Sequence, residues 1–288
     1  MSTVVWGVMS AGLAVLAVGL MLVWGRFRSA AGAAKVLVLA PVFEAAALAA
    51  FAAEHFLLSR GLMTIVPRWL PDPLFWTYFV GAALLAAAIS LLAWRQVRWS
   101  APLLALLFLI IVATIDVPNL PPHAHERLFW TLTFRELCFA SGAMVLTGSL
   151  WPRTNPVGAT LMLIGRLIVA LTFVFYAVEH FLFPRFVPGV PLEKLTPSWF
   201  PAPVVLSYFV GIVLLLGGVG LLIRRTVRIA ATSVGIVLLA LTAFFYVPIM
   251  VTEFHSQLAL EGVNYVFDTL LFAATALLAG FGVEETAV

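Results

Sequence analysis

The chain has 288 residues, of which 63% are hydrophobic and only 10% are charged. Soluble domains carry about 25% charged residues, so this composition excludes a water-soluble globule. The net charge of +3 does not indicate a nucleic-acid partner, because the basic residues stand singly or in small groups at the ends of apolar runs, where membrane topology places them.

Apolar runs of about 20 residues, the length that crosses roughly 30 Å of hydrocarbon, recur along the whole chain. The first run is long for a signal peptide, and basic residues follow it instead of preceding it, so we interpret it as a retained helix with the N-terminus outside. The pattern predicts an all-α polytopic membrane helix bundle with nine transmembrane helices: Val4–Trp24, Val36–Leu57, Leu74–Trp94, Ala101–Val117, Leu128–Leu150, Gly158–Phe183, Val204–Ile223, Ile229–Met250 and Gly262–Phe281.

The distribution of Lys and Arg predicts which loops face the cytoplasm. Nine basic residues on one side against five on the other favour an outer N-terminus and a cytoplasmic C-terminus with Glu284 and Glu285, in a multi-pass protein of the inner (plasma) membrane. The cytoplasmic set is Arg26, Arg28, Lys35, Arg95, Arg98, Arg153, Arg224, Arg225 and Arg228, and the outer set is Arg60, Arg68, Arg127, Arg185 and Lys194.

The chain contains an internal repeat. Residues 67–81 read PRWLPDPLFWTYFVG and residues 197–211 read PSWFPAPVVLSYFVG, with eight identities at an offset of 130. Upstream, EHFL at 54–57 recurs at 179–182, so the outer loop of the second copy is five residues longer. Four helices per copy make the copies parallel repeats. We expect an extra helix and loop at 1–34, and four-helix repeats at 35–153 and 154–288.

Each copy has a recognisable pattern. A helix ending in His55-Phe56, a V-P-x-W-L-P-x-P loop at 66–73 and a helix opening with aromatic residues and Gly81 resemble the DoxX family of four-helix membrane proteins. The resemblance implies two fused DoxX-like units in a membrane subunit of a redox or respiratory system, because family members include a subunit of a thiosulfate:quinone oxidoreductase. An acidic residue often follows the family's glycine. It is absent after Gly81 and Gly211, so its role is not carried over.

Ionisable groups inside apolar runs are candidate functional residues, because they are costly in a bilayer. Glu44 and His55 are eleven residues apart and share one helix face at roughly 16 Å separation. With Trp69, His180 and Trp199 from the outer rim, they are the candidate residues for a quinone-binding cleft. The alternative is that Glu44 hydrogen-bonds to a neighbouring helix and that the Trp side chains anchor the rim at the membrane interface.

Histidines at equivalent points of the two copies are candidate ligands of a metal ion or haem, since imidazole is a common ligand of both. The set is His55, His125, His180 and His255. Duplication alone also explains their symmetry, and interfacial histidines often cap helix ends.

Further charges lie inside the runs, and we expect opposite charges on adjacent helices to pair. Because sequence neighbours lie about 100° apart on a helix, we expect Arg135 and Glu136 to serve different partners. The other members of this set are Asp116, Arg166 and Asp268. Cys138, a lone cysteine in an apolar run, is expected to pack in the core.

These patterns favour a membrane subunit of a redox or respiratory system that binds quinone or another apolar redox molecule in the outer half of the bundle. The alternatives are a transporter for a small solute and a non-catalytic scaffold or assembly subunit. Expected partners are the lipid bilayer and other membrane subunits of a redox complex, with no nucleic acid. Phosphate-binding and nucleophile-elbow motifs are absent from the sequence.

Overall fold

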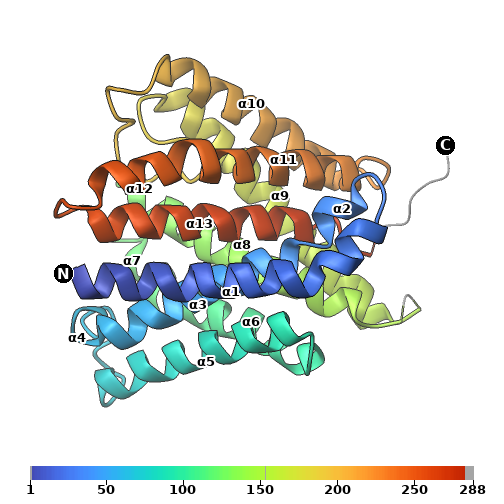
Figure 1. Ribbon diagram of the computed structural model, residues 1–288, viewed down its shortest axis with the longest axis horizontal. Helices are drawn as coiled ribbons and strands as arrows, with labels where there is room; N and C mark the ends of the chain where they lie inside the picture. The colour runs from blue at the N-terminus through green and yellow to red at the C-terminus, as the bar shows by residue number, and fades with distance from the viewer. Residues whose placement is uncertain (1, 153, 283–288) are drawn as a thin grey trace.

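The computed structural model describes residues 2–152 and 154–282, and within these ranges the chain is helical, without β-strands. An isolated antiparallel bridge joins Phe186 to Leu195. The long helices lie side by side along the longest dimension of the molecule (Figure 1). Arg153, Glu284 and Glu285, which the orientation argument used, lie outside the described residues.

The helices follow the apolar runs closely. In chain order they are α1 (Ser2–Ser29), α2 (Ala34–Leu37), α3 (Ala40–Leu57), α4 (Ser59–Leu62), α5 (Pro73–Ala93), α6 (Val97–Ile111), the π-helix η1 (Val112–Asp116), α7 (Val117–Asn119), α8 (Arg127–Ser149), α9 (Pro156–Leu182), α10 (Pro203–Leu222), α11 (Val227–Leu241), the π-helix η2 (Thr242–Tyr246), α12 (Val247–Glu253) and α13 (Ala259–Leu278).

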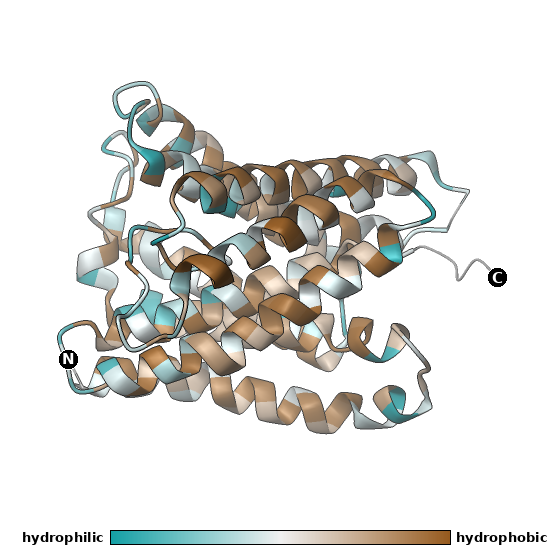
Figure 2. Cartoon of the chain, turned by 90° about the horizontal axis from the view of Figure 1, so that it is seen from above, coloured by the Kyte–Doolittle hydropathy of each residue, from teal (hydrophilic) through white to brown (hydrophobic). Residues whose placement is uncertain are grey.

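Among the described residues, seven helices are long and apolar enough to cross a membrane. Figure 2 shows hydrophobic residues along the helices and hydrophilic ones gathered towards the two ends of the bundle, as expected for a multi-pass membrane protein. The seven are Thr3–Ser29, Ala34–Leu57, Pro73–Ala93, Val97–Asn119, Pro156–Leu182, Pro203–Leu222 and Val227–Glu253.

Proline and capping side chains mark where several helices begin. Pro73, Pro156 and Pro203 stand at the first position of α5, α9 and α10, where a missing N–H costs nothing. Asn155 caps α9 by accepting hydrogen bonds from the N–H groups of Val157 and Gly158. These local signals fix where the helices begin, including α5, which borders the cavity described below.

The helices α8 and α13 occupy the centre of the bundle. The helix α13 packs against α3, α8 and α11, and α8 packs against α6, α9 and α13. Gly165 lets α9 approach α8 so closely that a Cβ there would lie 2.7 Å from the carbonyl oxygen of Ser141. At 23 and 20 residues both central helices match the spanning helices in length, but their charged side chains make them more polar.

Several elements recur at the offset of the sequence match. The helix α6 and the π-helix η1 begin at residues 97 and 112, and α11 and η2 begin at 227 and 242. The helices α5 and α10 begin at 73 and 203. The π-helical segments were not predicted, because nothing in the apolar pattern separates one wide turn from an α-helix.

Candidate functional site

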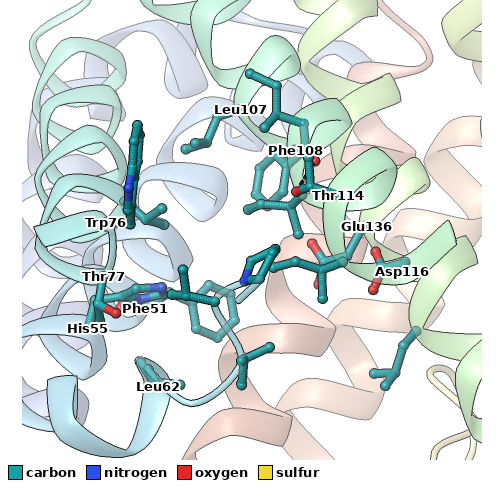
Figure 3. Close-up of a pocket in the computed structure, with 18 of the residues that line it drawn as sticks. Phe51, His55, Leu62, Trp76, Thr77, Leu107, Phe108, Thr114, Asp116 and Glu136 are labelled. Carbon is teal, nitrogen blue, oxygen red and sulfur yellow. Dashed lines mark hydrogen bonds between the residues drawn. The ribbon is translucent and has the colours of Figure 1, made fainter. Parts of the chain in front are cut away.

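A cavity of about 770 Å³ lies between α3, α5, α8, α13 and the continuous helix α6–η1–α7, beneath the loop that follows α4. It lies towards the end of the bundle that carries the N-terminus (Figure 1). Figure 3 shows Trp76, Thr77 and His55 on one side and Asp116 and Glu136 on the other. Its walls are largely apolar and include the aromatic residues Phe51, Trp69, Trp76, Phe79, Phe108, Phe129 and Phe139.

A polar network forms one side of the cavity. Arg135 on α8 donates to Glu136 at 2.9 and 3.2 Å and to Asp268 on α13 at 3.1 Å. Asn264, also on α13, donates to Glu54 on α3 at 3.0 Å. The network therefore ties α8 and α13 together, and α13 to α3, around a cavity in the hydrophobic part of the bundle.

The expectation that Arg135 and Glu136 serve different partners was wrong. The expectation followed from the different directions of the two Cα–Cβ bonds, but an arginine side chain is long enough to extend around the helix and reach the neighbouring residue. Its guanidinium has five N–H donors, so it binds Glu136 and Asp268 together. The pairing with Asp268 on another helix is as expected.

Three polar atoms in side chains that line the cavity have no hydrogen-bond partner among the described residues. They are Trp76 Nε1, Asp116 Oδ2 and Asn264 Oδ1. A buried polar group left unpaired costs about 1–3 kcal/mol, and such groups are rare in folded proteins. These atoms give the cavity hydrogen-bonding positions for a molecule with a polar part.

His55 reaches the cavity from the last turn of α3. Its Nδ1 donates to the carbonyl oxygen of Phe51 at 2.8 Å. Gly81 makes room for the ring on the α5 side, because a Cβ there would lie 2.8 Å from His55 Cβ. The second copy repeats this contact, because a Cβ at Gly211 would lie 3.0 Å from His180 Cβ, so the recurrence of the His-Phe and Gly segments reflects direct packing between these helices.

Of the other predicted site residues, Trp69 lines the cavity, whereas Glu44 and Trp199 do not. Glu44 is buried in α3, but it does not line the cavity, and its Oε2 has no partner among the described residues. Trp199 is half exposed on the loop before α10, where it contacts Phe200. The sequence therefore predicted part of the cavity, together with residues of its counterpart in the second half.

His180 is fully occupied by hydrogen bonds within the protein. Its Nδ1 donates to the carbonyl oxygen of Tyr176, and its Nε2 accepts from the N–H of Gly189 at 2.8 Å. His125 and His255 are exposed on loops. Among the described residues, no group of three or more His, Cys, Asp or Glu side chains is arranged to hold a metal ion. This arrangement gives no support to the prediction that His55, His125, His180 and His255 bind a metal ion or haem.

The corresponding space in the second half is filled by protein. Residues Val187–Pro191 of the loop after α9 are buried. Tyr246 donates a hydrogen bond to the carbonyl oxygen of Pro188, and Arg127 donates to those of Pro191 and Leu192. This loop is the one that carries the five additional residues, which allow it to fold into the bundle.

The polar residues of the cavity also differ between the halves. At an offset of 130, Tyr246, Tyr265 and Val266 stand where the first half has Asp116, Arg135 and Glu136. Conversely, the residues 130 positions before Asn264 and Asp268 of α13 are Phe134 and Cys138. Cys138 is buried, as expected. The polar network thus surrounds the cavity of the first half alone, within the residues the structure describes.

Asp116, Asn264 and Trp76 were not singled out from the sequence as site residues. Asp116 was noted only as a charge near a helix end, and Asn264 and Trp76 are common residue types near a membrane interface. Comparing the two copies position by position would have found Asp116, because its counterpart is Tyr246.

A family model described as a domain of unknown function (DUF8561) matches residues 45–117. No curated protein and no solved structure matches the chain. The matched segment is about a quarter of the chain. It runs from α3 to the end of η1 and includes Phe51, His55, Trp76 and Asp116, so it supplies three of the walls of the cavity.

Proposed function

We propose that the chain is an integral membrane subunit of a redox or respiratory system, and that it binds an apolar redox molecule of the quinone class in the cavity of the first half. The observation that carries the proposal is the cavity itself. It has about 770 Å³, largely apolar walls that include aromatic residues, and buried polar atoms without partners. Ligand sites in proteins have volumes of about 300–1,000 Å³ and combine mostly apolar walls with a few polar groups.

The chemistry of the cavity suits a flat ring with oxygen atoms at its edge. Phe51, Phe108 and Phe139 offer faces and edges for ring packing, which favours aromatic ligands. Trp76 Nε1 offers a hydrogen bond to a ring oxygen, and the acceptor Asp116 on η1 lies across the cavity (Figure 3). Asn264 on α13 is a second acceptor that lines the cavity. The DoxX-like pattern at 55–81 supports the same class of ligand.

The same proposal includes nine transmembrane helices in two parallel four-helix repeats. The helices α8 and α13, at about 1.5 Å per residue, are long enough to cross roughly 30 Å of hydrocarbon. Their charged side chains face protein, where the partners Glu136, Asp268 and Arg135 lie. The equal offsets of η1 and η2 support the repeat. The N-terminus, in this proposal, lies outside the cell and the C-terminus in the cytoplasm.

Mass spectrometry of the organic extract of gently solubilised protein tests the proposal. Wild-type protein is expected to retain a quinone, and Leu132→Trp is expected to lose most of it, because Leu132 lines the cavity. The matched control is Leu106→Trp, which places the same bulk on the exposed surface of α6. The proposal fails if wild-type protein holds no quinone and takes up none when it is supplied, or if both variants retain as much as wild type.

A further inference from the structure

The cavity presents more free hydrogen-bond acceptors than free donors. Asp116 Oδ2 and Asn264 Oδ1 are acceptors without a partner among the described residues. His55 adds a third, because its Nδ1 donates to a carbonyl oxygen and the neutral ring then carries a lone pair on Nε2. Trp76 Nε1 is the free donor of the set.

Several of the other donors that line the cavity are already in use, including three of the five N–H donors of Arg135. The hydroxyls of Thr77 and Thr114 donate to the carbonyl oxygens of Pro73 and Ile110. Arg135 directs its Nε, Nη1 and Nη2 groups to Glu136 and Asp268. An occupant therefore meets acceptors at most of the polar positions available to it.

Two of these acceptors, Asn264 Oδ1 and His55 Nε2, are fixed by hydrogen bonds that the same side chains donate within the protein. The Nδ2 of Asn264 donates to Glu54, which turns Oδ1 away from that carboxyl group. The Phe51 carbonyl can only accept, which fixes the proton of neutral His55 on Nδ1. The acceptors thus belong to fixed side chains on α3 and α13.

We propose that the cavity selects a molecule whose polar end donates hydrogen bonds, and so binds the hydroquinone form of a quinone couple in preference to the quinone form. The inference rests on the proposed function. A hydroquinone has two O–H donors for these acceptors, and its oxygens still accept from Trp76. A quinone has no donor, so it leaves Asp116, Asn264 and His55 unpaired in a buried site.

Preferential binding of one redox form changes the potential of the bound couple. Tighter binding of the reduced form makes the bound quinone easier to reduce, by about 30 mV for each tenfold preference in a two-electron couple. The cavity therefore favours reduction of a bound quinone, and the reduced ligand is the form that remains bound under reducing conditions.

Equilibrium dialysis under anaerobic conditions tests the preference, with a short-chain benzoquinone and its hydroquinone as probes and purified full-length protein in nanodiscs. Wild type is expected to bind the hydroquinone at least about tenfold more tightly, since the quinone leaves unpaired up to two acceptors that the hydroquinone satisfies, at about 1–3 kcal/mol each. Asp116→Asn is expected to reduce the preference to about threefold or less, because the new amide can turn its NH₂ to the ligand and donate to a quinone oxygen.

The matched control is Glu44→Gln, which makes the same change in a buried acid that does not line the cavity, and it is expected to keep the wild-type preference. Thermal unfolding of each variant checks that it folds. Equal or tighter binding of the quinone by wild type overturns the inference and leaves the proposed function standing. If neither form binds wild type, the proposed function fails as well.

Discussion

At the residue scale, the polar network of the cavity depends on Arg135. Its guanidinium lies between the carboxyl groups of Glu136 and Asp268, both of which are largely buried. In a low-dielectric interior a charged pair roughly balances its own desolvation cost, whereas a carboxylate that loses its partner does not. The network therefore matters more for giving these buried carboxyl groups hydrogen-bond partners beside the cavity than for net stability.

Replacing Arg135 with Met is expected to lower the free energy of unfolding by about 3–5 kcal/mol, because it leaves buried carboxylates unpaired. Arg135→Lys should lose less, since the positive charge remains. Reversible denaturant unfolding in mixed micelles measures both. Arg60→Met, at an exposed residue of the short helix α4, is the control and should stay within about 0.5 kcal/mol of wild type. A loss of less than 1 kcal/mol for Arg135→Met would contradict the structural role.

In the second half of the chain, Lys194 forms ion pairs whose contribution to stability should depend on pH. It bonds to Glu253 at 2.8 Å and Glu261 at 3.1 Å, holding the buried loop against α12 and α13. Burial alone would lower the pKa of Lys194, but the hydrogen bonds and charges of the two carboxylates outweigh it and raise the pKa above its usual 10.5. A raised pKa in the folded state contributes stability below the unfolded pKa, and this is lost as the pH rises through the folded pKa.

Lys194→Met is therefore expected to be less stable than wild type at neutral pH, and the difference should shrink as the pH rises above 10.5. Thermal unfolding of both proteins between pH 7 and about pH 12 measures it, and taking the difference removes effects common to both. A difference that is unchanged across this range would show that the ion pairs contribute nothing.

Some of these contacts could be predicted from the sequence and some could not. Opposite charges within apolar runs must find partners, which was enough to expect pairing between adjacent helices but not to name Asp268 as the partner of Arg135. The bond between Asn264 and Glu54 joins residues 210 positions apart, and neither has a local signal that identifies the other. The His-Phe motif identified His55, but the same motif also gave His180, whose ring is used by the loop.

At the scale of the elements, the outer loops distinguish the two halves. The loop after α3 leaves a cavity beneath it, while the longer loop after α9 folds into the bundle and is pinned by His180, Tyr246 and Arg127. The five-residue difference was visible in the sequence. Its consequence was not, because the length of a loop does not say whether it covers a space or fills it.

His180→Phe removes the acceptor of the Gly189 N–H, and leaving that buried group unpaired costs about 1–3 kcal/mol. The loop should then open more often, so trypsin is expected to cleave faster after Arg185 or Lys194. Timed proteolysis followed by mass spectrometry measures the rates. The equivalent variant His55→Phe serves as the control and should leave cleavage at these sites unchanged. Equal rates in all three proteins would mean that His180 does not hold the loop.

At the scale of the whole molecule, seven spanning helices follow from apolar length and composition alone. The helices α8 and α13 do not meet this criterion, because they are more polar; they pack at the centre of the bundle and carry the polar network. The apolar runs predicted all of these helices, but not which of them lie at the centre. The order in which they pack, with α13 from the end of the chain against α3 from its beginning, had no signal in the sequence.

Single cysteines in a Cys138→Ala background test the nine-helix topology. Thr64→Cys, His125→Cys and Gln257→Cys are expected to react with a membrane-impermeant maleimide added outside intact cells. Thr154→Cys is expected to react only after permeabilisation. Labelling of His125→Cys and Thr154→Cys from the same side would show that α8 does not cross the membrane, and labelling of Thr64→Cys only after permeabilisation would reverse the orientation.

The most direct test of a quinone site in the first half is photoaffinity labelling with an azido-quinone, followed by peptide mapping. We expect the label on peptides that contain Trp76, Asp116 or Phe129, with loss of labelling when unmodified hydroquinone competes. Label concentrated on the loop Val187–Pro191 or on α11 would place the site in the second half, and label spread over lipid-facing surfaces without competition would show that the cavity binds no quinone.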